Sequence, residues 1–201
     1  MSDGFLTLYT AQTQTVLDVI RRDGRSRVRR EFIQKKYGDE AWVFQQAYSF
    51  FAQHAPQYVA PPEGAESGIW CFKDWRWAVT GAGCFLIELS VPEDQAVLFD
   101  SRIWNRMLNL QYVGNSPEDE AAFEQRIANM GLKGPADAFS TSFYPMVKRE
   151  ILQSWQRLFG SAENCPDTYV EAGLWELRDE WIVSVREGCS HLIGTIVVLC
   201  W

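Results

Sequence analysis

The chain has 201 residues, of which 47% are hydrophobic and 14% aromatic, and its formal net charge at pH 7 is −7. This length suits one domain, and the aromatic content excludes a disordered chain. No apolar stretch reaches the roughly 20 residues that a membrane-spanning helix needs, and the amino-terminal residues do not resemble a signal peptide, so we expect a cytoplasmic protein without a membrane partner.

The first quarter of the chain predicts a strand followed by two helices. Residues 5–10 read as a short strand. Helical periodicity follows over 13–24, with Gly24 as a carboxy-terminal stop. Asp39 is expected to cap a second amphipathic helix that runs to His54.

A basic stretch lies between these two helices. Residues 21–36 hold eight basic residues against two acidic ones, although the chain as a whole is acidic. Such a stretch offers a local site for phosphate groups or for a macromolecular target, and Arg25, Arg27, Arg29 and Arg30 are the candidate contacts. The alternative is a solvated helix end and loop.

The middle of the chain is rich in strand patterns. Residues 69–79 and 84–91 flank a Thr-Gly-Ala-Gly turn at 80–83, which predicts a hairpin. A short strand over 96–99 ends at Asp100, which we expect to cap a short helix.

Two further helices and a return to strands complete the pattern. Ser116 and Asp119 form a capping box for a helix that ends at Gly131, and a long amphipathic helix covers about 145–159. Strands are then expected over about 168–177, 181–187 and 191–200.

The order of these elements predicts the fold class. Strands do not alternate with helices as a doubly wound fold requires, so the prediction is α+β. We expect a single domain over 1–201, with a split, mainly antiparallel sheet and flanking helices.

Most common catalytic patterns are absent from the sequence. The two histidines, His54 and His191, have no ligand-spaced partner, so no metal site is expected. No glycine-rich nucleotide loop precedes a helix, and no nucleophile-elbow motif is present. Five cysteines without a Cys-x-x-Cys pair indicate reduced thiols.

The remaining chemistry needs only a carboxylate, aromatic rings and hydrogen-bonding backbone. Cleavage of the nicotinamide–ribose bond of NAD is such a reaction, because its transition state resembles an oxocarbenium ion that a fixed carboxylate stabilises. Glu171 and Glu176 are the rival carboxylates near the end of the chain, and the strand register decides which of them faces a cleft.

Two family resemblances follow from longer stretches. The segments LYTAQ at 8–12, PPEG at 61–64 leading to IWCF at 69–72, LFDSRIWNRMLN at 98–109 and AGLWELRDEWIVSVR at 172–186 resemble a bacterial family of domain of unknown function 3841. That resemblance implies no activity.

The second, looser resemblance is to the ADP-ribosyltransferase fold, whose opening strand carries a Tyr-His or Tyr-Arg motif and whose late strand begins with a catalytic Glu. It implies that Glu171 is catalytic, that Tyr9, Thr10 and Gln12 bind NAD as substrate, and that Trp70 stacks on nicotinamide. Thr10 stands where such enzymes have His or Arg.

The second resemblance implies an NAD-dependent ADP-ribosyltransferase that modifies a protein or nucleic acid, as a bacterial toxin or phage-defence effector with an antitoxin or chaperone as partner. Two alternatives stay open: a non-catalytic module that binds a nucleotide or RNA end in the same cleft, and a protein of a two-gene system whose Trp-rich surface docks a partner.

Overall fold

The computed structural model of the protein describes residues 4–78, 81 and 83–187. Its centre is a sheet of six described strands in the order β5-β6-β3-β1-β4-β8, and all its paired neighbours run antiparallel. A second sheet pairs β2 with β7. The expected α+β class with a mainly antiparallel sheet is confirmed. The strands are β1 (Phe5–Thr13), β2 (Arg25–Ser26), β3 (Ile69–Phe72), β4 (Cys84–Pro92), β5 (Val97–Asp100), β6 (Val170–Leu174), β7 (Leu177–Arg178) and β8 (Ile182–Glu187).

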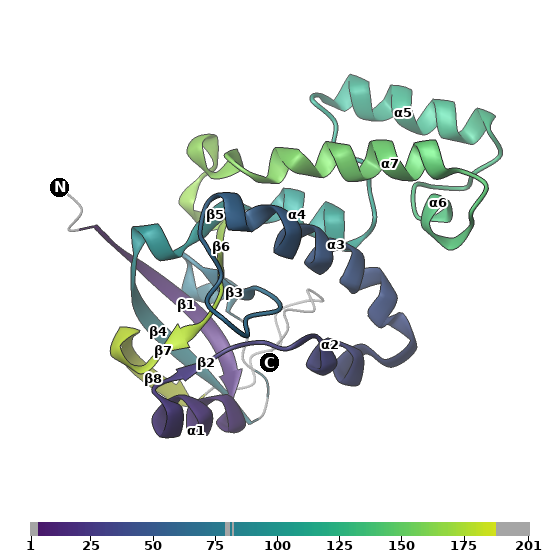
Figure 1. The fold of residues 1–201 in the computed structure, drawn as a ribbon. Coiled ribbons are helices and arrows are strands. Elements are labelled where there is room, and N and C mark those ends of the chain that lie inside the picture. The colour runs from purple at the N-terminus through teal and green to yellow at the C-terminus, as the bar shows by residue number, and fades with distance from the viewer. Residues whose placement is uncertain (1–3, 79–80, 82, 188–201) are drawn as a thin grey trace.

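Helices cover both faces of the large sheet. In Figure 1, α1 lies on one side of the sheet, while α3, α4 and α7 lie on the other. None of the helices among the described residues is both long and apolar enough to cross a membrane. The helices are α1 (Gln14–Asp23), α2 (Arg30–Tyr37), α3 (Ala41–His54), α4 (Ser101–Leu108), α5 (Pro117–Asn129), α6 (Asp137–Ser140) and α7 (Pro145–Ser154).

The buried side chains form two clusters, one on each face of the sheet. Leu17 of α1 belongs to the cluster that includes Cys71 of β3. Phe51 of α3 belongs to the other cluster, which includes Trp70 of β3 and Phe99 of β5. Because successive strand residues point to opposite faces, the neighbours Trp70 and Cys71 serve different clusters.

Two helix boundaries follow from signals in the sequence. Gly24 adopts the left-handed conformation (φ 73°) after α1, and its N–H donates to the Ile20 carbonyl at 2.8 Å. The Ser116 hydroxyl accepts from the backbone N–H of Asp119 at the start of α5. Both predicted boundaries are confirmed.

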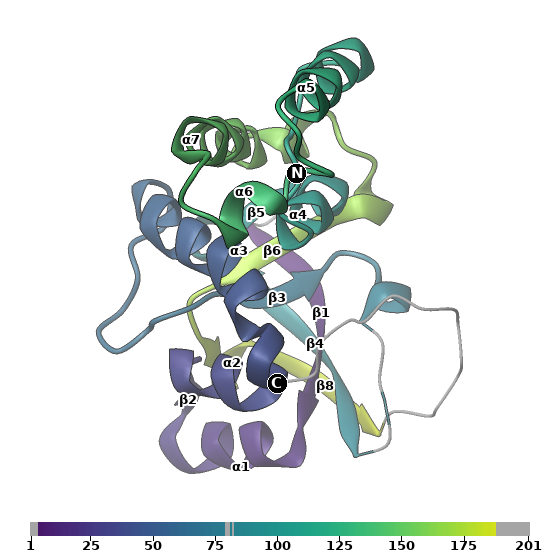
Figure 2. The ribbon, with the colours of Figure 1, turned by 90° about the vertical axis from the view of Figure 1, so that its right-hand side faces the viewer.

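The predicted hairpin between 69–79 and 84–91 is wrong. Figure 2 shows β3 and β4 on either side of β1, which pairs with both of them. The first of the two strands also ends at Phe72, because Asp74 accepts from the backbone N–H of Arg76 at 3.0 Å and starts a tight helical turn over Trp75–Trp77. The neighbours of β3 in the sheet are β6 and β1 instead of β4.

The prediction for the basic stretch and the second helix also needs correction. Residues 30–37 form α2, and α3 begins at Ala41 after a helical turn over Gly38–Glu40. Asp39 lies inside that turn and is not the cap of α3. The strand expected over 191–200 and the residue His191 lie outside the described residues.

Candidate functional site

A pocket borders the place where β1 and β3 diverge. The two strands share one register pair, Tyr9 with Phe72, whereas β1 follows β4 along its whole length. Next to this pair the Thr10 hydroxyl donates to the Trp70 carbonyl at 3.0 Å and accepts from the Gln12 amide at 2.9 Å. A side chain thus bridges the two strands where their backbone pairing stops.

Glu171 of β6 reaches this pocket from the neighbouring strand. It lies in register with Phe72 of β3 and Phe99 of β5, and only 6% of its surface is exposed. Its carboxyl group makes no hydrogen bond or ion pair with any residue that the structure describes. Burial raises the pKa of Glu171 to about 8, and the negative charge of Asp100 adds to the rise.

The start of α4 supplies polar groups to the pocket. Asp100 caps the helix by accepting from the backbone N–H of Arg102 at 2.8 Å, and it holds the Arg102 guanidinium at 2.6 Å. That guanidinium lies 4.9 Å from the centre of the Tyr169 ring. Burial alone would raise the pKa of Asp100, but the bonds from Arg102 hold this pKa below its usual value. Ser101 and Asn105, which are one helical turn apart, also line the pocket.

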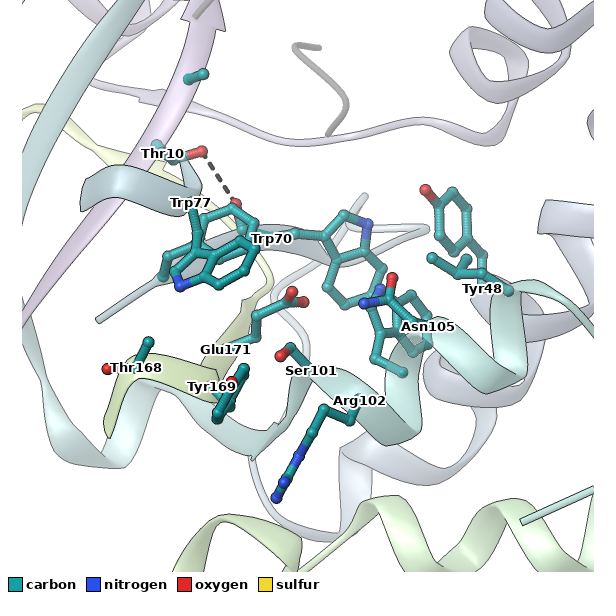
Figure 3. Close-up of a pocket in the computed structure, with 14 residues that line it drawn as sticks. Thr10, Tyr48, Trp70, Trp77, Ser101, Arg102, Asn105, Thr168, Tyr169 and Glu171 are labelled. Carbon is teal, nitrogen blue, oxygen red and sulfur yellow. Dashed lines mark hydrogen bonds between the residues drawn. The ribbon is translucent and has the colours of Figure 1, made fainter. Parts of the chain in front are cut away.

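Aromatic rings from several elements form the walls. The ring centroids of Trp70 and Trp104 are 4.4 Å apart, and those of Trp77 and Tyr169 are 6.2 Å apart. In Figure 3 the carboxylate of Glu171 points into the space that the rings of Trp70, Trp77 and Tyr169 border. The cavity has a volume of about 130 Å³. That volume holds a single aromatic ring and falls short of the roughly 300 Å³ at which sites for larger ligands begin.

A shallow hollow of about 390 Å³ adjoins the pocket, and Thr168 borders both. Its two cationic side chains are already paired, Lys73 with Asp167 at 2.9 Å and Arg76 with Asp74 at 2.5 Å. The hollow is lined by Tyr9, Lys73, Asp74, Trp75, Arg76, Asp167 and Thr168.

The structure brings together three of the residues expected to handle NAD. Thr10, Trp70 and Glu171 line the same pocket. Tyr9 lines the adjoining hollow instead. Gln12 is 1% exposed and does not line the pocket. Its side-chain amide donates a hydrogen bond to the Thr10 hydroxyl instead.

Glu176, the rival carboxylate, is held in ion pairs with two arginines. It is 3% exposed and lies between Arg27, at 2.8 Å, and Arg178, at 2.7 Å. Although burial opposes them, these two cations hold the pKa of Glu176 below its usual value. Glu171 is therefore the carboxylate that faces the pocket.

The predicted arginine contacts lie away from the pocket. Arg27 is engaged by Glu176, and Arg25 of β2 is exposed beside β7. Arg29 lies 3.9 Å from Glu31 at the start of α2, with most of its side chain in solvent. The side chain of Arg30 lies outside the described part of the structure. None of these residues is among those that line the pocket.

Several lining residues were not predicted from the sequence. Ser101, Arg102 and Asn105 follow a buried strand and a capping aspartate, and that signal could have placed them at the edge of the sheet. Tyr48 comes from α3, and no local pattern connects it with Glu171. Trp77 was expected in a strand and reaches the pocket from a helical turn.

The described residues contain no group of three or more His, Cys, Asp or Glu side chains that could hold a metal ion. Cys71 and Cys84 are free and buried, and burial raises the pKa of the Cys71 thiol to about 12. Cys71 is therefore a protonated core residue and a poor nucleophile.

Comparison with known proteins gives one result. A family model described as Domain of unknown function (DUF3841) matches residues 7–183. No curated protein and no solved structure matches the chain.

Proposed function

The chain belongs to the DUF3841 family, and from that premise we propose that it is an NAD-dependent ADP-ribosyltransferase that uses the pocket around Glu171 to modify a protein or nucleic acid. The observation that carries this proposal is a buried carboxyl group that has no partner among the described residues and faces a cavity walled by aromatic rings. A buried acid without a partner lowers the stability of a protein, and acids with strongly shifted pKa values cluster at functional sites.

The proposed reaction uses that carboxylate electrostatically. The bond between ribose C1′ and the nicotinamide nitrogen breaks, and its electron pair stays on the nitrogen, so nicotinamide leaves as a neutral ring. The ribose gains oxocarbenium character, which a carboxylate beside it stabilises. A hydroxyl or amine of the macromolecule then bonds to C1′, and its proton passes to Glu171 or to water.

The strand arrangement supports this assignment. The resemblance to the ADP-ribosyltransferase fold calls for an opening strand, a strand with a stacking residue and a late strand with a glutamate to lie together. In this protein β1, β3 and β6 are consecutive in the sheet. Thr10 stands in place of the usual His or Arg, and its hydroxyl is already bonded to Trp70. Ser101 and Asn105 are therefore the polar groups that we assign to the nicotinamide amide.

The sizes of the two cavities suggest how NAD would lie. The pocket takes the nicotinamide ring, and the adjoining hollow that Tyr9 lines takes the next part of the dinucleotide. The positive charge of the bound ring favours the ionised form of Glu171, so binding would lower the raised pKa of this group.

The test is incubation of the protein with cell extract and NAD that is labelled in its adenosine half. We expect label to enter protein or nucleic acid with the wild type, and at least about a hundredfold less with Glu171→Gln. Glu180→Gln is the matched control, because this exposed carboxylate lies on the same chain segment and outside the pocket. Equal labelling by wild type and Glu171→Gln would remove Glu171 from the reaction.

One observation favours the second candidate, a binding module for a nucleotide or RNA end. With a pKa of about 8, Glu171 is protonated at neutral pH and can donate a hydrogen bond to a base, as neutral buried carboxylic acids do elsewhere. In that case Glu171→Gln, which also donates, retains ligand binding, and neither protein consumes NAD.

A further inference from the structure

In the part of the chain that the structure describes, Glu171 differs from the other buried acids in lacking a positive partner. Asp100 is paired with Arg102 at 2.6 Å, and Glu176 is paired with Arg27 and Arg178. Among the described residues, no cation forms an ion pair with Glu171, whose carboxyl group borders the open space of the pocket. Arginines neutralise the other two buried acids, and the described residues leave the charge of Glu171 for a ligand to neutralise.

The walls of this space suit a positive charge as well as a flat ring. Trp70 and Trp104 approach it from β3 and α4, and Trp77 and Tyr169 come from two helical turns. The face of an aromatic ring carries partial negative charge and attracts a cation, and the attraction is stronger where water is excluded. Carboxylate and aromatic faces therefore attract the same kind of ligand.

The one cationic side chain among the described lining residues does not cancel this effect. Arg102 is held by two nitrogens against Asp100, and its guanidinium lies over the outer ring of Tyr169. More than half of its side chain is in solvent. Its charge is thus neutralised by Asp100 and screened by water at the rim of the pocket.

We infer that this pocket selects a flat aromatic cation, such as an N-alkylated pyridinium ring, over the same ring without charge. The part of this inference that concerns product release rests on the proposed function. The binding preference itself can be measured without any reaction. The nicotinamide ring of NAD is such a cation. Once the bond to ribose breaks, the electron pair on nitrogen makes the ring neutral, the attraction to Glu171 is lost, and the product leaves.

The test compares small probes by calorimetric titration of the full chain at pH 9, where Glu171 is ionised. We expect 1-methylnicotinamide, a cation, to bind at least about tenfold more tightly than neutral nicotinamide. Tetramethylammonium, a cation that is not flat, should bind several-fold more weakly than 1-methylnicotinamide. In Glu171→Gln the preference for the charged ring should fall to less than about threefold, while Glu180→Gln should keep the wild-type preference.

A second variant separates the aromatic wall from the carboxylate. Trp77 is only partly buried in its turn, so Trp77→Leu should fold and should weaken 1-methylnicotinamide binding several-fold. Equal binding of the two rings by the wild type, a preference that survives in Glu171→Gln, or no measurable binding of 1-methylnicotinamide would each overturn the inference. Transfer from NAD without a charge preference would overturn this inference alone, and a charge preference without transfer would overturn only the proposed reaction.

Discussion

Glu171 and Glu176 lie close together in the sequence and are both buried, but their surroundings have opposite electrostatic effects. Glu171 faces a cavity and keeps its proton to about pH 8, whereas Glu176 is ionised between two arginines. The same substitution, glutamate to glutamine, should therefore have opposite effects on stability at the two positions.

Glu171→Gln should stabilise the protein at alkaline pH. In the unfolded chain a glutamate loses its proton near pH 4.3, but in the folded protein Glu171 keeps it to about pH 8. The folded state binds the extra proton, so the stability of the wild type falls as pH rises through this window. Arg102 and Tyr48 also line the pocket, and Asp100 is paired with Arg102 beside it. The pKa of Tyr48 is raised to about 12 and that of Asp100 is lowered, so neither group changes its charge in this window.

Urea unfolding of both proteins at pH 5, 7 and 9 measures this effect. We expect the variant to gain on the order of 5 kcal/mol relative to wild type at pH 9 and only about 1 kcal/mol at pH 5. A variant that is less stable than the wild type at pH 9 would show that Glu171 has a stabilising partner.

Glu176→Gln should destabilise the protein. The folded-state pKa of Glu176 is lowered, so its contribution to stability is present above pH 4.3 and is lost as pH falls below that value. Removal of its charge leaves Arg27 and Arg178 without their shared carboxylate, at a cost of about 2–4 kcal/mol. Thermal or urea unfolding at pH 7 measures the loss, and an unchanged free energy of unfolding would mean that solvent already satisfies the two arginines.

At the scale of elements, the fit between α3 and the sheet depends on one glycine. Gly173 of β6 faces Phe51 of α3, and a Cβ atom added at this position would collide with the Phe51 ring. The same strand carries Glu171, with one residue between them.

Gly173→Ala should therefore destabilise the protein by about 1–3 kcal/mol, because the overpacked ring has to move. Urea unfolding measures the change. A paired variant, Phe51→Leu with Gly173→Ala, should recover part of the loss, and a loss that the second substitution does not reduce would mean that the strain lies elsewhere.

Local signals predicted most of the elements but not their pairing. Gly24 and Ser116 mark real helix ends, because capping depends on a few neighbouring residues. Residues 69–79 alternate like a strand, yet the side chain of Asp74 turns the chain after Phe72. Asp74 is a local capping signal, and the strand-like alternation over 69–79 concealed it.

At the scale of the whole molecule, the sheet order assembles the pocket from segments far apart in the chain. Thr10, Trp70, Ser101 and Glu171 come from four separate elements. The sequence supplied Glu171, Thr10 and Trp70 as candidates through a family resemblance. Local spacing does not show that α4 and Tyr48 contribute to the pocket. Nor does it show that β1 lies between β3 and β4, because strand pairing joins residues far apart in the sequence.

The arrangement of the tryptophans also bears on the reading of this protein as a docking partner. Trp104, Trp155 and Trp175 are buried, whereas Trp42 and Trp75 are exposed on different elements. Most of the described tryptophans thus belong to the core or to the walls of the pocket. This gives little support to a Trp-rich surface that docks a partner.

The most direct measurement of the central claim is the rate at which the purified protein releases nicotinamide from NAD, followed by chromatography in the presence of cell extract. The account predicts steady release by the wild type and by Glu180→Gln, and release at least about a hundredfold slower by Glu171→Gln. Because Glu171→Gln is expected to be no less stable than the wild type, a loss of activity would not reflect unfolding. No release by the wild type, or equal release by Glu171→Gln, would contradict the account.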